Sequence, residues 1–225
     1  MSLDVFITGG TGYIGRSLIP GLLARGHRVL AVVRPGSESR LTRGAFAVSG
    51  DVLDGTTYRN AIPAAATFVQ LVGVSHPSPS KAAQFRAVDL VSAREAVAAA
   101  RAAAVSHFVY VSVAHPAPAM KAYIQVREEV EQILVRDGMD ATILRPWYVL
   151  GPGHRWPYLL LPAYWICERL PQTRDAACRL GLVTLEQMVS ALVAAVEGPA
   201  SGIRIVDVPG IRNATLSDFA RRSAA

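Results

Sequence analysis

The sequence predicts an α/β fold, a doubly wound parallel sheet with a short C-terminal helical cap. Short apolar runs rich in Val, Ile and Phe alternate with longer helical segments over roughly residues 3–153. The runs lack polar alternation, as expected of strands that are covered on both faces. A glycine-rich turn joins the first run to the first helical segment. Strands that alternate with helices imply βαβ crossovers, and therefore a parallel sheet.

The individual elements follow from these runs and from the turn residues between them. The predicted strands are residues 5–8, 28–33, 45–48, 67–74, 108–113 and 141–145, with 203–208 as a further candidate. The predicted helices are residues 12–25, 56–61, 81–104, 121–136 and 185–196. Gly26 and Gly138 stand where helix C-caps are expected, each shortly before the next strand.

Composition excludes several classes of protein. With 225 residues, 51% of them hydrophobic and only 18% charged, the chain is not disordered and is long enough to bury about 70% of its surface. Mean hydropathy is +0.29, yet no apolar run reaches the roughly 18 to 20 residues that span a bilayer. The N-terminal residues lack the basic region of a signal peptide. We therefore expect a cytoplasmic protein.

Charge and cysteine content point away from nucleic acids and metals. The net charge is +6 and almost all of it is arginine, because Lys81 and Lys121 are the only lysines. No run of four basic residues occurs, so the arginines are expected on a solvated surface, with some serving a phosphate-rich cofactor. Cys167 and Cys178 form no CxxC motif. Two reduced thiols are favoured over a disulfide, and no metal site is expected.

The strongest local signal is the turn after the first strand, where glycines at 9, 12 and 15 open a helix. Such glycines permit a tight turn, close approach of the backbone to a diphosphate, and close helix–strand packing. The free N–H groups and the positive dipole end at the helix N-terminus favour binding of the diphosphate. The predicted cofactor contacts in this turn are Gly9, Thr11, Gly12, Tyr13, Ile14 and Gly15.

The end of the second predicted strand indicates which dinucleotide binds. NAD sites place a carboxylate there, whereas this strand ends at Arg34 and the next carboxylate is Glu38. Arg34 would pair with a 2′-phosphate, and Arg16, with Arg40 or Arg43, would add positive charge. NADP(H) is therefore favoured over NAD(H), with a solvated loop charge as the alternative for Arg34.

Two further loops are expected to complete the cofactor site. Asp51 and Val52 follow the third strand, where Asp51 is placed to accept a hydrogen bond from the adenine amino group. Val72 and Gly73 lie at the end of the fourth predicted strand, near the topological switch point, where a glycine lets the cofactor lie close.

Together these motifs resemble the short-chain dehydrogenase/reductase superfamily in its extended and atypical branches. NmrA-like NAD(P)-binding proteins and nucleoside-diphosphate-sugar epimerases look most similar. The resemblance covers roughly residues 3–153 and implies a Rossmann fold that binds NAD(P). The motifs that carry it are residues 8–15, 50–52, 108–112, Tyr123 with Arg127, 142–146 and 151–153.

The resemblance also implies catalytic residues. Redox members of this superfamily use a Tyr and, four residues later, a Lys that binds the nicotinamide ribose and lowers the tyrosine pKa. Here Tyr123 is kept and Arg127 replaces the lysine, although a guanidinium is not interchangeable with an ammonium. Ser112 is the candidate catalytic hydroxyl, although the family usually has it one position later, where this chain has Val113; alternatively, Ser112 is the small residue against the nicotinamide. The resemblance also implies that Ser112, Tyr123 and Arg127 contact the cofactor. A surface Tyr123 in cation–π contact with Arg127 is the alternative.

Three functions stay open on these residues. An NADPH-dependent oxidoreductase acting on a small carbonyl or quinone is favoured. A non-catalytic NADP(H)-binding sensor, scaffold or assembly factor is second. Sugar-nucleotide epimerase chemistry is third, because the tail is short for a second diphosphate site.

The C-terminal part is the least informative about function. Pro146, Trp147 and Val149 are expected to close over the nicotinamide, with plain packing as the alternative. The aromatic segment 154–166 suits a packed cap, a lipophilic substrate lining or a weak membrane-interface contact. His115 and His154 are candidate substrate donors. We expect residues 1–153 to form the NAD(P)-binding domain and 154–225 a cap that does not fold independently. The oligomeric state, monomer or homodimer, is left open.

Overall fold

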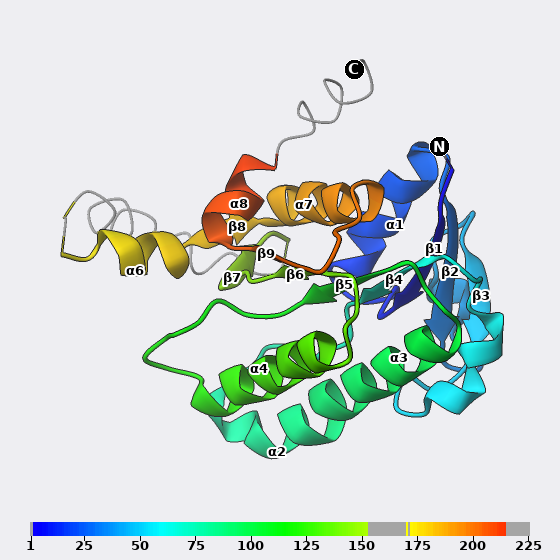
Figure 1. Cartoon of the computed structure of the whole chain (residues 1–225), viewed down its shortest axis with the longest axis horizontal. Coiled ribbons are helices and arrows are strands. Elements are labelled where there is room, and N and C mark those ends of the chain that lie inside the picture. The colour runs from blue at the N-terminus through cyan, green and yellow to red at the C-terminus, as the bar shows by residue number, and fades with distance from the viewer. Residues whose placement is uncertain (1, 153–169, 171, 215–225) are drawn as a thin grey trace.

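A seven-stranded parallel sheet runs through the centre of the molecule, which is shown here as a computed structural model (Figure 1). The structure describes residues 2–152, 170 and 172–214. The strand order is β3-β2-β1-β4-β5-β6-β9. The strands are β1 Asp4–Thr8, β2 Arg28–Val33, β3 Phe46–Ser49, β4 Thr67–Gln70, β5 His107–Val111, β6 Ala141–Leu144 and β9 Ile203–Val206. The order reverses between β1 and β4, so the predicted doubly wound fold is confirmed.

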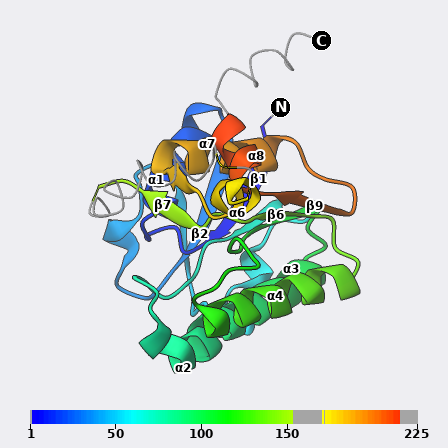
Figure 2. The same cartoon turned by 90° about the vertical axis from the view of Figure 1, so that its left-hand side faces the viewer.

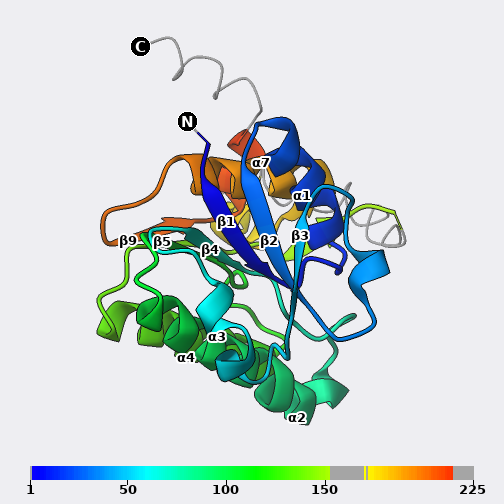
Figure 3. The same cartoon turned by 90° about the vertical axis from the view of Figure 1, so that its right-hand side faces the viewer.

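Helices cover both faces of this sheet (Figures 2 and 3). One face carries α1 Gly15–Ala24, α7 Leu185–Glu197 and α8 Val208–Asn213, and the other carries α2 Ala82–Gln84, α3 Val91–Ala102 and α4 Lys121–Arg136.

Two hydrophobic cores result, one on each face. Successive residues of a strand point to opposite faces, so Phe6 enters the core under α3 and α4 while Val5 and Ile7 enter the core under α1 and α7. In the first core the rings of Phe68 and Phe108 stack with their centroids 5.1 Å apart.

Several predicted boundaries are confirmed. Helix α4 matches the predicted range, and α7 begins at the predicted residue with a capping box between Thr184 and Gln187. Gly26 and Gly138 have φ values of 80° and 63°, as expected just beyond helix C-termini. Strand β9 confirms the further candidate strand over residues 203–206, whereas Val208 of the predicted range begins α8.

Three predictions were wrong in detail. Strand β4 ends at Gln70, so Val72 and Gly73 lie beyond it, where the chain passes close to Gly9. The predicted helix 56–61 is two short 3-10 turns, Gly55–Thr57 and Arg59–Ala61, which end just before a proline.

The third prediction that was wrong in detail is the continuous helix 81–104. It is interrupted by a π-helical stretch, Phe85–Leu90, between α2 and α3. A 3-10 turn, Pro79–Lys81, precedes α2. Another 3-10 turn lies in the loop after β2, at Glu38–Arg40.

The sequence patterns did not predict the small elements near the C-terminus. Strands β7 Tyr148–Leu150 and β8 Leu182–Thr184 form a separate parallel pair, and α6 spans Arg174–Arg179. The division at residue 153 stays a prediction. The described residues after it supply β9 to the central sheet and pack α7 against α1. In the described ranges no helix combines the length and apolar character needed to cross a membrane.

Candidate functional site

The glycine turn after β1 is built from close backbone contacts. Gly9 has a φ of +81°, and a Cβ there would lie 2.9 Å from the carbonyl carbon of Leu71. A Cβ on Gly15 would lie 2.5 Å from the Gly9 carbonyl oxygen and 2.7 Å from the Gly10 Cα. The start of α1 can therefore press against the turn only because these positions carry no side chain.

The outer surface of the same turn is open. Gly12 is exposed, and a Cβ there would meet only the Gly9 carbonyl oxygen, at 3.1 Å. The N–H groups of Ile14 and Gly15 donate to no backbone carbonyl of a described residue. Arg16 is fastened to the turn through its Nε, which donates to the Thr11 carbonyl at 2.7 Å. A glycine-lined surface with N–H groups at a helix N-terminus fits a diphosphate.

The predicted adenosine contacts lie at the same edge of the sheet, because parallel strands end there together. Arg34 directly follows β2 and is exposed. The first carboxylate after it, on Glu38, accepts from the N–H of Gly36 at 3.1 Å and so serves its own loop. Asp51 follows β3, with its Oδ1 accepting from the Leu53 N–H at 2.9 Å. Val52 packs against the first core.

Arg127 and Tyr123 are in cation–π contact, although Tyr123 is half-buried against the first core rather than a surface residue. The guanidinium carbon of Arg127 lies 4.9 Å from the ring centroid of Tyr123, whose other neighbour is the ring of Phe85. Arg127 is only 5% exposed. It donates to the Val111 carbonyl at 2.9 Å and to the Tyr110 hydroxyl at 3.3 Å.

A buried carboxylate holds the other side of the Arg127 guanidinium. Nη2 of Arg127 donates to Oδ1 of Asp89 at 2.5 Å, and Asp89 is fully buried. Burial raises the pKa of the Asp89 carboxyl, while the charge of Arg127 and the N–H of Val74 oppose that shift. The guanidinium thus lies in a buried ion pair, at the position where the resemblance implies a lysine that binds the nicotinamide ribose.

Gly73 adjoins this ion pair. A Cβ on Gly73 would lie 2.6 Å from Nη2 of Arg127 and 3.2 Å from Oδ1 of Asp89. Gly73 is itself exposed. Its inner side therefore rests on the Asp89–Arg127 pair, and the surface predicted to face the cofactor is its outer side.

Ser112 also meets a buried carboxylate. Its Oγ donates to Oε1 of Glu131 at 2.5 Å, and Glu131 is bound in turn by Nε of Arg145 at 3.0 Å. His115 lies beside this group, with Nδ1 3.0 Å from Oε1 of Glu128 and Nε2 3.5 Å from Oε2 of Glu131. The serine proton and the imidazole are thus directed at α4.

The residues that follow β6 are held in place by contacts with the rest of the protein. The Pro146 carbonyl accepts from the N–H of Ala114 at 2.9 Å, and Trp147 and Val149 pack against the second core. Tyr13 reaches this region, because its hydroxyl lies where a Cβ of Gly151 would be. Contact of Pro146, Trp147 and Val149 with a cofactor stays a prediction.

The sequence patterns did not indicate two residues of these networks, Asp89 and Glu131. Asp89 shares a helical face with the apolar residues Phe85 and Ala93. A lone carboxylate on such a face indicates a buried carboxylate that needs a partner. Glu131 follows Arg127 at the same i+4 spacing by which Arg127 follows Tyr123. The aromatic segment 154–166, with His154, and Cys167 lie outside the described residues.

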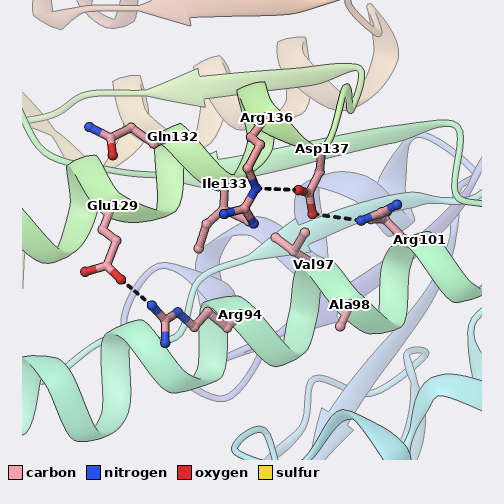
Figure 4. Close-up of a pocket in the computed structure, with 9 residues that line it drawn as sticks. All are labelled: Arg94, Val97, Ala98, Arg101, Glu129, Gln132, Ile133, Arg136 and Asp137. Carbon is pink, nitrogen blue, oxygen red and sulfur yellow. Dashed lines mark hydrogen bonds and ion pairs between the residues drawn. The ribbon is translucent and has the colours of Figure 1, made fainter.

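A pocket of about 560 Å³ lies between α3 and α4 and contains none of the predicted site residues (Figure 4). Ion pairs join the two helices across it, Arg94 with Glu129 and Arg101 with Asp137. This groove is distinct from the edge of the sheet where the glycine turn lies.

Known proteins with similar sequences are reductases. A 3-diazoavenalumate denitrifying reductase from a Streptomyces species is 28% identical over 99% of this chain and 82% of its own length. The ceramide reductase of Caulobacter vibrioides is 26% identical over 88% of this chain and 62% of its own length.

Two solved structures of similar fold contain NAD. One is a short-chain dehydrogenase/reductase superfamily protein from Agrobacterium tumefaciens with bound NAD, with a TM-score of 0.65, 19% identity, and coverage of 98% of this chain and 83% of that one. The Bordetella bronchiseptica enzyme WbmH in complex with NAD⁺ gives a TM-score of 0.66, 21% identity, and coverage of 98% and 82%.

A family model described as NAD(P)H-binding matches residues 9–155, which include the glycine turn, Arg34, Tyr123 and Arg127. The chain therefore belongs to this NAD(P)H-binding family.

Proposed function

We propose that this chain is an NADPH-dependent reductase of the atypical, NmrA-like type, acting on a small, lipophilic carbonyl or quinone substrate. The observation that carries the proposal is the open glycine turn at Gly12 together with an exposed Arg34 at the end of β2, while the Glu38 carboxylate is engaged in its own loop. An arginine at that place suits a 2′-phosphate. The reductases among the similar proteins support the reaction type.

The chemistry divides between cofactor and protein. A reduced dinucleotide held by the glycine turn and Arg34 would supply the hydride for the substrate carbon. Tyr123 donates the proton to the substrate oxygen, and the fixed positive charge of Arg127, 4.9 Å from its ring centroid, stabilises the tyrosinate that remains. Ser112 is buried and its proton is directed to Glu131, so it serves as the small residue against the nicotinamide rather than as a second donor.

Cofactor choice is tested by titrating the protein with NADPH and with NADH. Replacing Arg34 with Ala should weaken NADPH binding by about tenfold or more, because a charged hydrogen bond to the 2′-phosphate is lost, and should change NADH binding little. Arg59→Ala is the matched control, because Arg59 is exposed but lies in the 3-10 turn after β3. Equal losses for both cofactors in Arg34→Ala would refute the assignment.

Turnover is tested by following NADPH oxidation with a panel of aldehydes, ketones and quinones. Tyr123→Phe should lower kcat by about a hundredfold or more, the usual effect of removing a general acid, while NADPH still binds. An active acceptor whose rate is unchanged in Tyr123→Phe would exclude Tyr123 as the proton donor.

A non-catalytic NADP(H)-binding role is the second candidate. The observation that favours it is the engagement of both Arg127 and Ser112 by buried carboxylates, those of Asp89 and Glu131. Tight NADPH binding with no turnover of any acceptor in the panel would support this role as a sensor or scaffold.

The weak membrane-interface contact expected of segment 154–166 is a separate question. Co-sedimentation of the protein with liposomes tests it, and protein that stays in the supernatant counts against it.

A further inference from the structure

Asp89 is a fully buried carboxylate with both oxygens engaged. It lies in the π-helical stretch before α3. Its Oδ1 accepts from Nη2 of Arg127 at 2.5 Å, and its Oδ2 accepts from the backbone N–H of Val74 at 3.0 Å. One side chain therefore connects helix α4 with the segment that follows β4.

Each of these two contacts reaches a predicted part of the site. Through Arg127, Asp89 fixes the guanidinium that lies 4.9 Å from the ring centroid of Tyr123. Through Val74, it fixes the backbone beside Gly73, whose inner side rests on the ion pair. The carboxylate thus determines where both the proton donor and the segment 72–74 lie.

The backbone of Asp89 extends the connection to the glycine turn. Its carbonyl accepts from Oγ of Ser92 at 3.2 Å, and that oxygen accepts from Nε2 of Gln70 at 3.3 Å. Oε1 of Gln70 accepts from the hydroxyl of Thr8, the residue before Gly9. All of these side chains are buried, so the polar chain runs beneath both halves of the predicted cofactor site.

We propose that Asp89 is a positioning residue of this site, which holds Arg127 beneath Tyr123 and at the same time sets the backbone of segment 72–74 against the cofactor. The proposal rests on the proposed function. A carboxylate is required because two donors and a buried positive charge face it. An asparagine has one acceptor oxygen and would turn an N–H donor towards Arg127 or Val74.

Three variants test the proposal: Asp89→Asn, the double variant Asp89→Asn/Arg127→Met, and Glu129→Gln as control. Glu129 lies on α4 but pairs with Arg94 across the outer groove. For each variant we would measure the thermal midpoint, the Kd for NADPH by calorimetry, and kcat with the best acceptor, at a temperature well below every midpoint.

In Asp89→Asn we expect the Kd for NADPH to rise about tenfold and kcat to fall by at least as much, because small misplacements of reacting groups are costly. In the double variant the buried Asp89–Arg127 ion pair is removed, and the single amide oxygen can accept from the N–H of Val74. Its thermal midpoint and Kd should return towards the wild-type values while kcat stays low. Glu129→Gln should match the wild type in Kd and kcat.

Two outcomes would overturn the proposal. The first is an Asp89→Asn variant with a lower thermal midpoint but wild-type Kd and kcat, which would make the ion pair purely structural. The second is a double variant that regains kcat together with stability. If wild-type protein binds NADPH but reduces nothing, the reductase function fails, yet the Kd values still decide the role of Asp89.

Discussion

Single buried side chains determine much of the chemistry available to this chain. Arg127 and Ser112 are each directed at a carboxylate on a helix that covers one face of the sheet, Asp89 and Glu131. A buried guanidinium without a partner costs several kcal/mol, so Arg127 requires Asp89 wherever the helix places it. The arginine, at the position where the resemblance implies a lysine, is thus accompanied here by a carboxylate that pairs with it.

A buried histidine at the opposite edge of the sheet predicts how stability depends on pH. His107 begins β5, is fully buried, and lies 3.0 Å through its Nε2 from the Thr142 hydroxyl. Burial and the nearby charge of Arg204 lower its pKa from 6.5 to about 4, against the opposing charge of Asp140. The folded protein therefore keeps this imidazole neutral where the unfolded chain would protonate it.

The resulting stability is complete above pH 6.5 and is lost as the pH falls from 6.5 towards 4. The full loss from this one group is about 3 kcal/mol. His107→Gln cannot titrate, so its free energy of unfolding, measured in urea, should fall less steeply over this range. His76→Gln is the control, because His76 is exposed. Equal slopes for His107→Gln and wild type would contradict the prediction.

At the scale of elements, the turn between β1 and α1 has two sides: one is needed for folding, and the other is open for binding a ligand. The side of the turn at Gly15 faces backbone of the turn itself, whereas the side at Gly12 faces outward. Two glycines three residues apart therefore have different reasons to lack a side chain.

Gly15→Ala should destabilise the fold by about 1 to 3 kcal/mol, because its Cβ would lie 2.5 Å from the Gly9 carbonyl oxygen and backbone must move. Gly12→Ala should unfold nearly like wild type but bind NADPH at least about tenfold more weakly, because the methyl group occupies the diphosphate surface. Thermal melts and calorimetry separate the two effects. A Gly12→Ala variant with wild-type affinity would move the diphosphate elsewhere.

At the scale of the whole molecule, residues from both ends of the chain form one core. Leu192 on α7 is fully buried with Leu18 and Leu22 of α1 and with Val5 of β1. The described C-terminal residues are therefore part of the packing that supports the glycine turn.

Leu192→Ala should lower the free energy of unfolding by about 2 to 5 kcal/mol in a single cooperative transition, because it leaves a cavity in this shared core. The exposed Val135 of α4 offers a control, and Val135→Ala should change stability little. Denaturation followed by both circular dichroism and tryptophan fluorescence checks this. Two separate transitions in Leu192→Ala would show that the C-terminal region unfolds on its own.

Part of the candidate site could be predicted from the sequence because it depends on the spacing of residues close together in the chain. The three glycines, Arg34 after β2 and the i+4 pair Tyr123 and Arg127 need only neighbours along the chain. The end of β4 could not be predicted, because Val72 and Val74 continue the apolar run although the strand ends at Gln70.

The sequence by itself determined the layered parallel sheet and the dinucleotide turn, since strands buried on both faces must be apolar and a diphosphate cradle must be glycine-rich. Only the tertiary structure decided what Arg127 and Ser112 touch. Their partners, Asp89 and Glu131, are too far from them in the sequence for a local pattern to predict the pairing. The pairs form in the fold because buried charged and polar groups must be hydrogen-bonded.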